Sequence, residues 1–368
     1  NSLIASGAIF ACRLTGMARE IVYTSLFGAT GVLDAFYTAF RIPNLLRDLF
    51  AEGALSQSYT SVASKTREAE GDAAAWELTN KVATQLSTLM VAIVTLGILF
   101  AGPIMEALYS GNHSVTDQLF ATDLSRIMWP FIGFASLSAL VMGALNMVGV
   151  FGLPMLASAA FNVTSILLGL LIGWFIDPSF GPKALYGFAC GVTLGGIAQI
   201  AVQLPKLRRT GFRWKPNFQW NDPKIKKIWG LMLPSVLASG VTQFTIFINT
   251  GFALNLQKGS VTALTTAFRL WQLPVGLFGV ATGMVVLPAV SRMMVGNGRK
   301  EVAAHIARGL RLVAFFAIPA FLILYILGTE FVSSVYQWGR FSQDAVRYTG
   351  EVLGAYSLGL LGLSLIHI

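Results

Sequence analysis

The chain has 368 residues, of which 55% are hydrophobic and 12% are charged, and its formal net charge is +9. A soluble globular domain carries about 25% charged residues, so the composition excludes that class and favours an integral membrane protein. Cys12 and Cys190 both lie inside apolar predicted helices, and the three histidines are scattered without metal-ligand spacing. The sequence therefore argues against a disulfide framework and a metal site, and no cofactor is expected.

Long runs without Asp, Glu, Lys or Arg recur along the chain, and each is long enough for a helix to cross a bilayer core of ~30 Å. The longest run, 127–176, can hold two crossings, with Asn146, Gly149 and Pro154 marking a tight turn between them. The sequence therefore predicts an all-α polytopic membrane protein with nine complete transmembrane helices and part of a tenth from about residue 344. The predicted helices span 2–27, 34–63, 80–105, 122–147, 153–176, 184–204, 226–256, 261–291 and 302–327.

Lysine and arginine are concentrated in the connections after the second, sixth and eighth predicted helices. Such residues mark cytoplasmic connections, so we expect even-numbered helices to end in the cytoplasm and the N-terminus to lie there. Topology thus explains the positive charge, and no nucleic-acid partner is expected. The connection Leu207–Lys227 also contains Phe212, Trp214, Phe218 and Trp220, which suits a segment lying on an anionic leaflet; a solvated loop is the alternative.

The predicted helices divide the chain into an N-terminal six-helix lobe (1–204), a cytoplasmic or interfacial linker (205–225) and a partial C-terminal lobe (226–362). The chain begins without methionine and stops within an apolar helix, so we expect it to be a fragment lacking C-terminal helices. Residues 363–368 match one reading frame of a common sequencing adapter. We expect them to be an adapter-derived scar that takes no part in the fold.

Charged residues stand inside several predicted helices, where each costs about 2.5–3.5 kcal/mol on insertion scales. Arg13 and Glu20 lie seven residues apart on one helix face, whereas Arg19 and Arg47 point away from the charged faces of their helices. We therefore expect that not every arginine is neutralised by its own helix. Charges of this kind persist where they face a protein interior or a wet cavity. The alternatives are structural ion pairs and snorkelling to the interface, which accounts for Glu20 and Asp34 near helix ends.

The excess of arginine over acid in these helices suits a diphosphate, because planar guanidinium groups match phosphate oxygens bidentately. Arg269 is the one charged residue between Lys258 and Arg292, and no acidic residue neighbours it in the sequence. These residues together favour a polar cavity that binds an anionic ligand.

The segment Arg13-Leu14-Thr15-Gly16-Met17-Ala18-Arg19-Glu20 resembles the first-helix motif of the MurJ/MviN family. That family's pattern continues in order through Phe27-Gly28-Ala29, Asp34-Ala35-Phe36, Pro43-Asn44-Leu45-Leu46-Arg47 and Phe50-Ala51-Glu52-Gly53-Ala54. Weaker echoes follow at Gln203-Leu204-Pro205, Arg269, Gly279-Val280-Ala281, Leu287-Pro288 and Gln337-Trp338-Gly339-Arg340-Phe341. The resemblance covers nearly the whole chain.

The resemblance implies a lipid II flippase of the MOP exporter superfamily, with a MATE-like fold of two lobes around a cationic cavity. Such a transporter is not an enzyme. By alternating access it carries undecaprenyl-diphosphate-linked disaccharide-pentapeptide from the cytoplasmic to the periplasmic leaflet of the bacterial inner membrane. Its other expected partners are membrane lipids and cell-wall synthesis proteins. Carried onto this chain, the substrate-binding residues are Arg13, Arg19, Arg47 and Arg269, and the supporting cavity residues are Asp34, Asn44, Glu52 and Arg41.

The chain departs from the family pattern at Cys12, where serine is usual, at Phe268, where aspartate commonly precedes the arginine, and at Gln272, where some members have glutamate. The missing acid makes the site around Arg269 more positive, or leaves its charge to be balanced by substrate.

Other function classes stay open at this point. An exporter of drugs or of another polyprenyl-oligosaccharide would share the fold, but a drug exporter is expected to use a carboxylate-based cation site. A membrane enzyme acting on polyprenyl phosphates would need clustered acidic residues to hold Mg²⁺, and the predicted helices show none. A non-transporting scaffold is disfavoured only by the buried charges.

Overall fold

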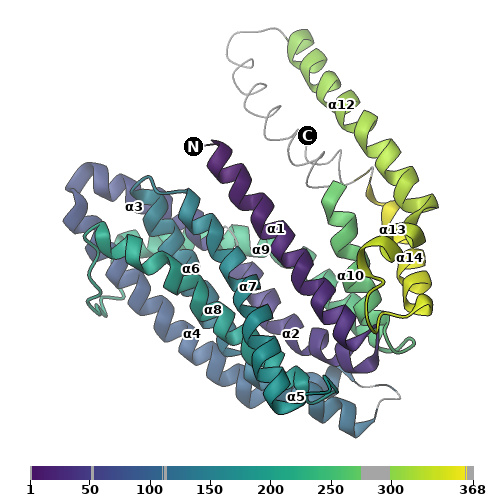
Figure 1. Cartoon of the computed structure of the whole chain (residues 1–368). Helices are drawn as coiled ribbons and strands as arrows, with labels where there is room; N and C mark the ends of the chain where they lie inside the picture. The colour runs from purple at the N-terminus through teal and green to yellow at the C-terminus, as the bar shows by residue number, and fades with distance from the viewer. Residues whose placement is uncertain are drawn as a thin grey trace. The chain divides into compact units, whose positions relative to one another are not determined.

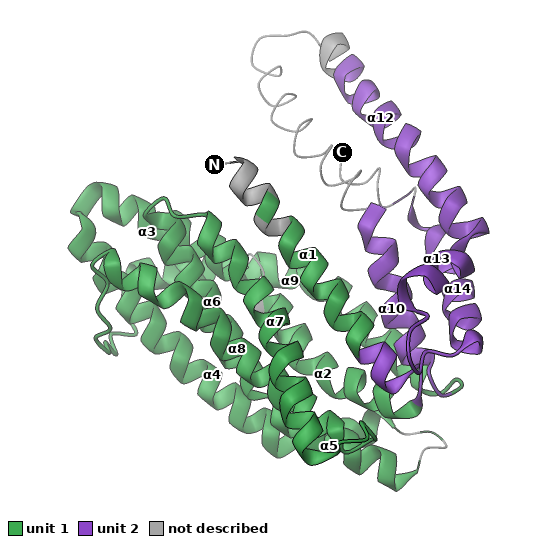
Figure 2. Cartoon of the chain, in the orientation of Figure 1, with its two compact units in different colours: residues 1–22, 31–257 green, residues 23–30, 258–368 purple. Residues whose placement is uncertain are grey.

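A computed structural model of the chain describes residues 2–50, 54–109, 111, 114–274, 299–360 and 362. Over these residues the secondary structure is helical and contains no strand, which confirms the all-α prediction (Figure 1). The chain forms two compact units, coloured separately in Figure 2. The first unit comprises residues 1–22 and 31–257, and the second comprises residues 23–30 and 258–368. Glu52 and the suspected scar at 363–368 lie outside the described residues.

The helices are named as in Figure 1. The first unit holds most of α1 (Ser2–Phe27) and all of α2 (Gly31–Phe50), α3 (Ala54–Glu70), α4 (Asp72–Leu108), α5 (Val115–Met128), α6 (Pro130–Met147), α7 (Gly152–Ile176), α8 (Ala184–Arg209) and α9 (Pro223–Leu254). The second unit holds the C-terminal end of α1 with α10 (Ser260–Pro274), α12 (Arg299–Ile326), α13 (Gly328–Tyr336) and α14 (Gln343–Ser357).

Six helical segments within the described residues are long and apolar enough to cross a membrane. They are Asp72–Leu108, Val115–Met147, Gly152–Ile176, Ala184–Arg209, Pro223–Leu254 and Ala303–Ile326. They correspond to the third to seventh and the ninth predicted helices. The second predicted helix falls on α2 and α3, and the eighth continues from α10 into 275–298, outside the described ranges. The membrane class is confirmed, and the count of nine complete helices stays a prediction.

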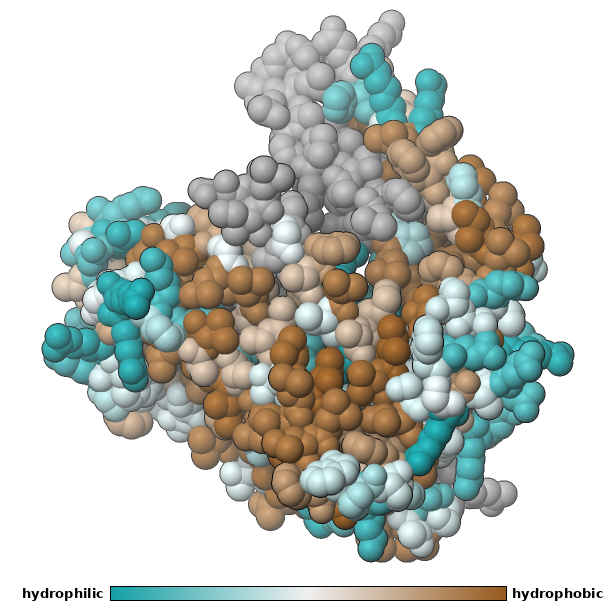
Figure 3. Space-filling view, viewed as in Figure 1, coloured by the Kyte–Doolittle hydropathy of each residue, from teal (hydrophilic) through white to brown (hydrophobic). Residues whose placement is uncertain are grey.

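Large apolar side chains are exposed along the helices that could cross a membrane. Leu99 on α4, Phe175 on α7 and Val241 on α9 are 66%, 70% and 71% exposed, respectively. On the face shown in Figure 3, hydrophobic side chains gather over the middle of the first unit, and hydrophilic ones at its α3 end. Apolar surface of this extent is unusual on a soluble monomer and is expected where a helix faces lipid.

The predicted turn between the two crossings of 127–176 is confirmed. The backbone N–H of Val150 donates to the carbonyl of Leu145 at 2.9 Å, and Gly149 has a φ of +80°. A left-handed residue closing the end of a helix is the usual place for glycine, because a side chain is strained there. The chain can therefore reverse tightly from α6 into α7.

Helices α7 and α8 pack with their backbones in close contact. A Cβ atom added at Gly187 of α8 would lie 2.2 Å from the backbone nitrogen of Gly173 on α7. In the same way, a Cβ atom added at Gly191 of α8 would lie 2.9 Å from the backbone nitrogen of Gly169 on α7. Small residues at a helix interface permit this approach, which stabilises helix pairs in membranes through van der Waals contact.

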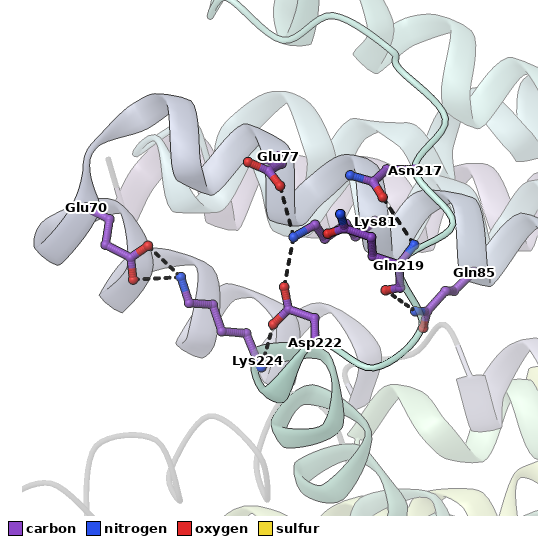
Figure 4. Close-up of polar contacts among 8 residues, drawn as sticks. All are labelled: Glu70, Glu77, Lys81, Gln85, Asn217, Gln219, Asp222 and Lys224. Carbon is purple, nitrogen blue, oxygen red and sulfur yellow. Dashed lines mark hydrogen bonds and ion pairs between the residues drawn. The ribbon is translucent and has the colours of Figure 1, made fainter.

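The start of α9 is fastened to α3 and α4 by an ion-pair cluster shown in Figure 4. The Nζ atom of Lys81 on α4 lies 2.9 Å from Oδ2 of Asp222 and 2.9 Å from Oε1 of Glu77. The Nζ atom of Lys224 lies 2.6 Å from Oε1 of Glu70 at the end of α3. Asp222 also caps α9 by accepting a hydrogen bond from the backbone N–H of Lys224 at 2.8 Å.

The linker between α8 and α9, residues 210–222, is held along α4 by side-chain amide and hydroxyl groups. The backbone N–H of Lys215 donates to Oδ1 of Asn80 at 3.0 Å, and that of Asn217 donates to Oγ1 of Thr84 at 3.0 Å. These bonds attach the linker to α4, and the first unit continues through α9 to Gln257. Helix α8 also continues to Arg209 before the linker begins.

Burial by itself would raise the pKa of Asp222. The hydrogen bonds from Lys81 and from the Lys224 backbone, together with the charges of both lysines, outweigh burial and hold that pKa below its usual value. The carboxylate is therefore ionised at neutral pH and can keep α9 attached to α4.

Candidate functional site

Helix α1 carries three of the predicted intramembrane charges, and their surroundings differ. The side chain of Arg13 is exposed in the folded chain, whereas Arg19 is 8% exposed and Glu20 is 1% exposed. Arg13 and Arg19 are six residues apart, which separates them by about 9 Å along the helix axis. One basic residue of this helix is therefore exposed, and the other is buried.

Arg19 is held against an aromatic stack that crosses the first unit. Its Cζ atom lies 5.0 Å from the ring centroid of Phe161 on α7, within the range of a cation–π interaction. The ring of Phe161 lies 5.0 Å from that of Phe131 on α6, which in turn lies 5.4 Å from that of Phe40 on α2. Through this stack, the guanidinium group of Arg19 is connected to side chains from α7, α6 and α2.

Asn162 fastens α1 to α7 beside this stack. It is 6% exposed, and its Nδ2 atom donates to the carbonyl of Cys12 at 3.4 Å and to Oγ1 of Thr15 at 3.3 Å. The hydroxyl of Thr15 donates to the carbonyl of Ala11 at 2.8 Å, so it can accept from Asn162 at the same time. Sequence reasoning missed Phe161 and Asn162, although Asn162 is a large polar residue within an apolar run.

Arg47 near the end of α2 forms an ion pair with the next residue, Asp48. The second oxygen of Asp48, Oδ2, accepts a hydrogen bond at 3.2 Å from Nδ2 of Asn44. Arg47 therefore has an acidic partner on its own helix, although helix periodicity alone places it away from the charged face of α2. The arginine side chain is long enough to reach a neighbouring carboxylate that stands on a different helix face.

Arg47 also lines a pocket of about 110 Å³ together with residues of α6, α7 and α8. The α7 wall of this pocket is formed by Pro154, Ala157 and Ser158. Phe161, which contacts Arg19, follows Ser158 by three residues on the same helix. Arg19 therefore contacts the same short stretch of α7, residues 154–162, that forms one wall of the pocket beside Arg47.

The predicted supporting residues are placed as follows. Asp34, at the start of α2, is 5% exposed, Arg41 is half-buried in the middle of that helix, and Asn44 binds Asp48. Glu52 lies outside the described residues.

Arg269 belongs to the second unit, on α10, and is half-buried. The preceding residue, Phe268, stacks on Trp271 with 5.5 Å between ring centroids and lies 5.7 Å from the ring of Tyr356 on α14. Phe268, the departure from the family pattern, thus contributes to an aromatic cluster that packs α10 against α14. The convergence of all four arginines stays a prediction, because Arg269 and the other three are in separate units.

Candidate metal ligands do not gather among the described residues. No group of three or more His, Cys, Asp or Glu side chains there could hold an ion, and both cysteines are free thiols. Besides the carboxylates of Glu20, Asp34 and Asp48, the described site offers guanidinium groups, amides and aromatic rings. These groups can bind an anion and polar, uncharged groups.

Comparison with known proteins identifies the family of this chain. Residues 23–368 match the family model described as lipid II flippase MurJ. The lipid II flippase MurJ of Burkholderia cenocepacia is 35% identical over all of this chain, which covers 71% of that relative. A probable lipid II flippase MurJ of Bdellovibrio bacteriovorus is 33% identical, with 98% of this chain and 68% of the relative covered.

Solved structures agree with the family match. A lipid II flippase MurJ in an inward closed conformation aligns with 99% of this chain and 74% of its own, with a TM-score of 0.81 and 26% identity. An inward-facing multidrug resistance MATE transporter of the MOP superfamily aligns with all of this chain and 84% of its own. Its TM-score is 0.72 at 14% identity, which is a likeness of fold alone. The family match over nearly the whole chain and the relatives at 33–35% identity establish that this chain belongs to the lipid II flippase MurJ family.

Proposed function

We propose that this chain carries lipid II from the cytoplasmic to the periplasmic leaflet of the bacterial inner membrane by alternating access, with Arg13, Arg19, Arg47 and Arg269 binding its diphosphate. Family membership supports transport of this lipid. The observation that carries the binding mode is that one stretch of α7, residues 154–162, contacts Arg19 and also forms a wall of the pocket that Arg47 lines.

A diphosphate suits this arrangement better than a single carboxylate does. It offers several oxygens in a compact group, and each guanidinium can donate two parallel N–H bonds to such oxygens. In the described structure Asp48 partly neutralises Arg47. The more highly charged diphosphate can compete with Asp48 for the guanidinium group, while Phe161 keeps Arg19 in position from the side. Binding would thus exchange one set of charge-assisted bonds for a stronger one.

The remaining parts of the proposal concern the whole transporter. We place the N-terminus in the cytoplasm, on the basis of the lysines and arginines after the second, sixth and eighth predicted helices. The functional lobes are 1–204 and 226–362, joined by the linker, and transport needs them to move about the substrate. Asp34, Arg41, Asn44 and Glu52 keep their supporting role, and cell-wall synthesis proteins are the proposed protein partners.

The test is substitution of Arg19 and Arg47, one at a time, by alanine and by lysine. Each hydrogen bond between a guanidinium group and a phosphate oxygen contributes about 1.5–3 kcal/mol to the binding free energy. Each alanine variant loses at least one such bond, so it should bind lipid II at least tenfold more weakly. Lysine should restore part of this affinity, because it keeps the charge and loses the planar fork. The matched control is Arg126→Ala, an exposed arginine on α5 that pairs only weakly with Asp123 at 3.5 Å.

Binding to purified protein and transport in cells are both measured, with the amount of folded protein in the membrane as the reference. If the alanine variants at Arg19 and Arg47 bind and transport as Arg126→Ala does, the arginines are not ligands. If they accumulate only as unfolded protein, and lysine does not rescue binding, the arginines are structural and the binding mode is wrong.

A further inference from the structure

The pocket beside Arg47 has polar walls that the diphosphate does not use. Besides Arg47 from α2, its polar groups are Ser138 on α6, Ser158 on α7, and Gln199 and Gln203 on α8. The other lining residues are small or apolar. All of these residues belong to the first unit, so the pocket is complete within it.

Gln203 is fully buried, and its amide is fixed by its neighbours. Its Nε2 atom donates to Oγ of Ser138 at 2.7 Å and to the backbone carbonyl of Gln199 at 2.9 Å. The carbonyl of Gln199 can only accept, so the nitrogen must stand on that side of the amide. The other end, Oε1, has no hydrogen-bond partner among the described residues.

A buried acceptor without a partner is unfavourable by about 1–3 kcal/mol, so native proteins rarely leave one in place without a reason. A ligand that brings an N–H or O–H into the pocket would satisfy it. The volume of about 110 Å³ admits a group of a few heavy atoms. Arg47 in the wall disfavours a cation, and the two glutamines and two serines suit a neutral group that both donates and accepts hydrogen bonds.

We propose that this pocket is a subsite for one neutral substituent of the sugar attached to the diphosphate of lipid II, with Oε1 of Gln203 accepting a hydrogen bond from the hydroxyl or amide N–H of that substituent. The inference rests on the proposed function, because Arg47 is shared between the diphosphate site and the pocket wall. A group joined directly to the diphosphate is within reach of the pocket when Arg47 holds a phosphate oxygen. The subsite would let the protein distinguish a glycosylated carrier lipid from the bare one.

The experiment compares two probes on the purified protein, lipid II and undecaprenyl diphosphate without sugar. The wild-type protein should bind lipid II more tightly. Gln203→Met keeps much of the side-chain volume and removes the amide, so it should lower lipid II affinity about three- to tenfold and leave affinity for the bare diphosphate unchanged. Arg47→Ala should weaken binding of both probes, because it acts on the shared diphosphate.

A second pair of variants tests the subsite without altering Gln203. Ser158 and Ser165 are both on α7, seven residues apart, but only Ser158 lines the pocket, whereas Ser165 is buried elsewhere. Ser158→Ala should reduce the preference for lipid II, and Ser165→Ala should not. If Gln203→Met does not fold, the comparison of Ser158→Ala with Ser165→Ala still tests whether the pocket is a subsite.

The outcomes separate the two proposals. A preference for lipid II that survives in both Gln203→Met and Ser158→Ala overturns the subsite and leaves the flippase proposal standing. Equal loss of both probes in Gln203→Met also overturns it, since Gln203 would then only support Arg47. If the wild-type protein binds neither probe, the proposed function itself fails.

Discussion

Replacing Gly187 by alanine should destabilise the first unit by forcing α7 and α8 apart. The added Cβ would lie 2.2 Å from the nitrogen and 2.5 Å from the Cα of Gly173, and 2.7 Å from the carbonyl carbon of Ile172. All three atoms are backbone, so no side chain can rotate away and one helix must shift. Residues 154–162, which contact Arg19 and line the Arg47 pocket, lie on α7 and depend on this packing.

The size of the effect follows from two opposing contributions. Overpacking in a well-packed interior costs about 1–3 kcal/mol, and contact with backbone places this case at the upper end. Alanine regains about 0.5–1 kcal/mol over glycine in a helix. A net loss of about 2 kcal/mol should lower the melting temperature by roughly 4–8 °C for a unit of this size.

The matched control is Gly230→Ala on α9, where an added Cβ would meet nothing within 4 Å. This variant should keep or slightly raise the melting temperature, because alanine restricts the unfolded chain. Thermal unfolding of the two purified variants, followed by tryptophan fluorescence, gives their melting temperatures. Equal melting temperatures for the two alanine variants would refute the close packing of α7 on α8.

Three further predictions concern the site, the linker attachment and the topology. Phe161→Leu should reduce transport severalfold, because the cation–π contact of Phe161 with the buried Arg19 is worth about 0.5–2 kcal/mol. Phe175→Leu, on the exposed face of the same helix, should leave transport unchanged. The measurement is transport per folded molecule, and an equal effect of the two variants would contradict the role of Phe161. The folded pKa of Asp222 is lowered, so its ion pair stabilises the protein above the unfolded pKa of about 3.9 and loses that effect as the pH falls through the folded value. Thermal stability relative to Asp222→Asn should therefore be constant from pH 7 to about 5 and converge below about pH 4, and a difference that persists at lower pH would contradict the ion pair. Single cysteines at Gly111 and Arg208, without the native cysteines, should label from the periplasm and the cytoplasm, respectively, with an impermeant reagent; labelling of both from outside would overturn the orientation.

Length and composition were sufficient to predict the helical membrane fold. A run of about 20 apolar residues has few alternatives to a membrane-spanning helix, and the turn before α7 follows from glycine and proline in the middle of a double-length run. The family relationship was also predictable, because the charged motif of the first helix and the blocks that follow it are specific. These features are local in the sequence, so reading along the chain can find them.

Features that depend on contacts between distant segments could not be predicted. Lys81 and Asp222 are 141 residues apart, and their ion pair helps to hold the start of α9 in the first unit. Phe161 and Asn162 acquire their role from the placement of α1 against α7, which no periodicity reveals. The pair between Arg47 and Asp48 was missed because helix faces describe Cα positions, whereas a long arginine side chain reaches beyond its own face.

The most direct test of the account is the distribution of lipid II between the two leaflets in cells that depend on this protein. Cells depleted of their own flippase and supplied with this protein are treated from outside with an enzyme that cleaves lipid II. Lipid II should become accessible with the wild-type protein and stay protected with the Arg19→Ala, Arg47→Ala double variant at equal protein abundance. Equal accessibility with the double variant and the wild-type protein would contradict the claim that these arginines carry the substrate across.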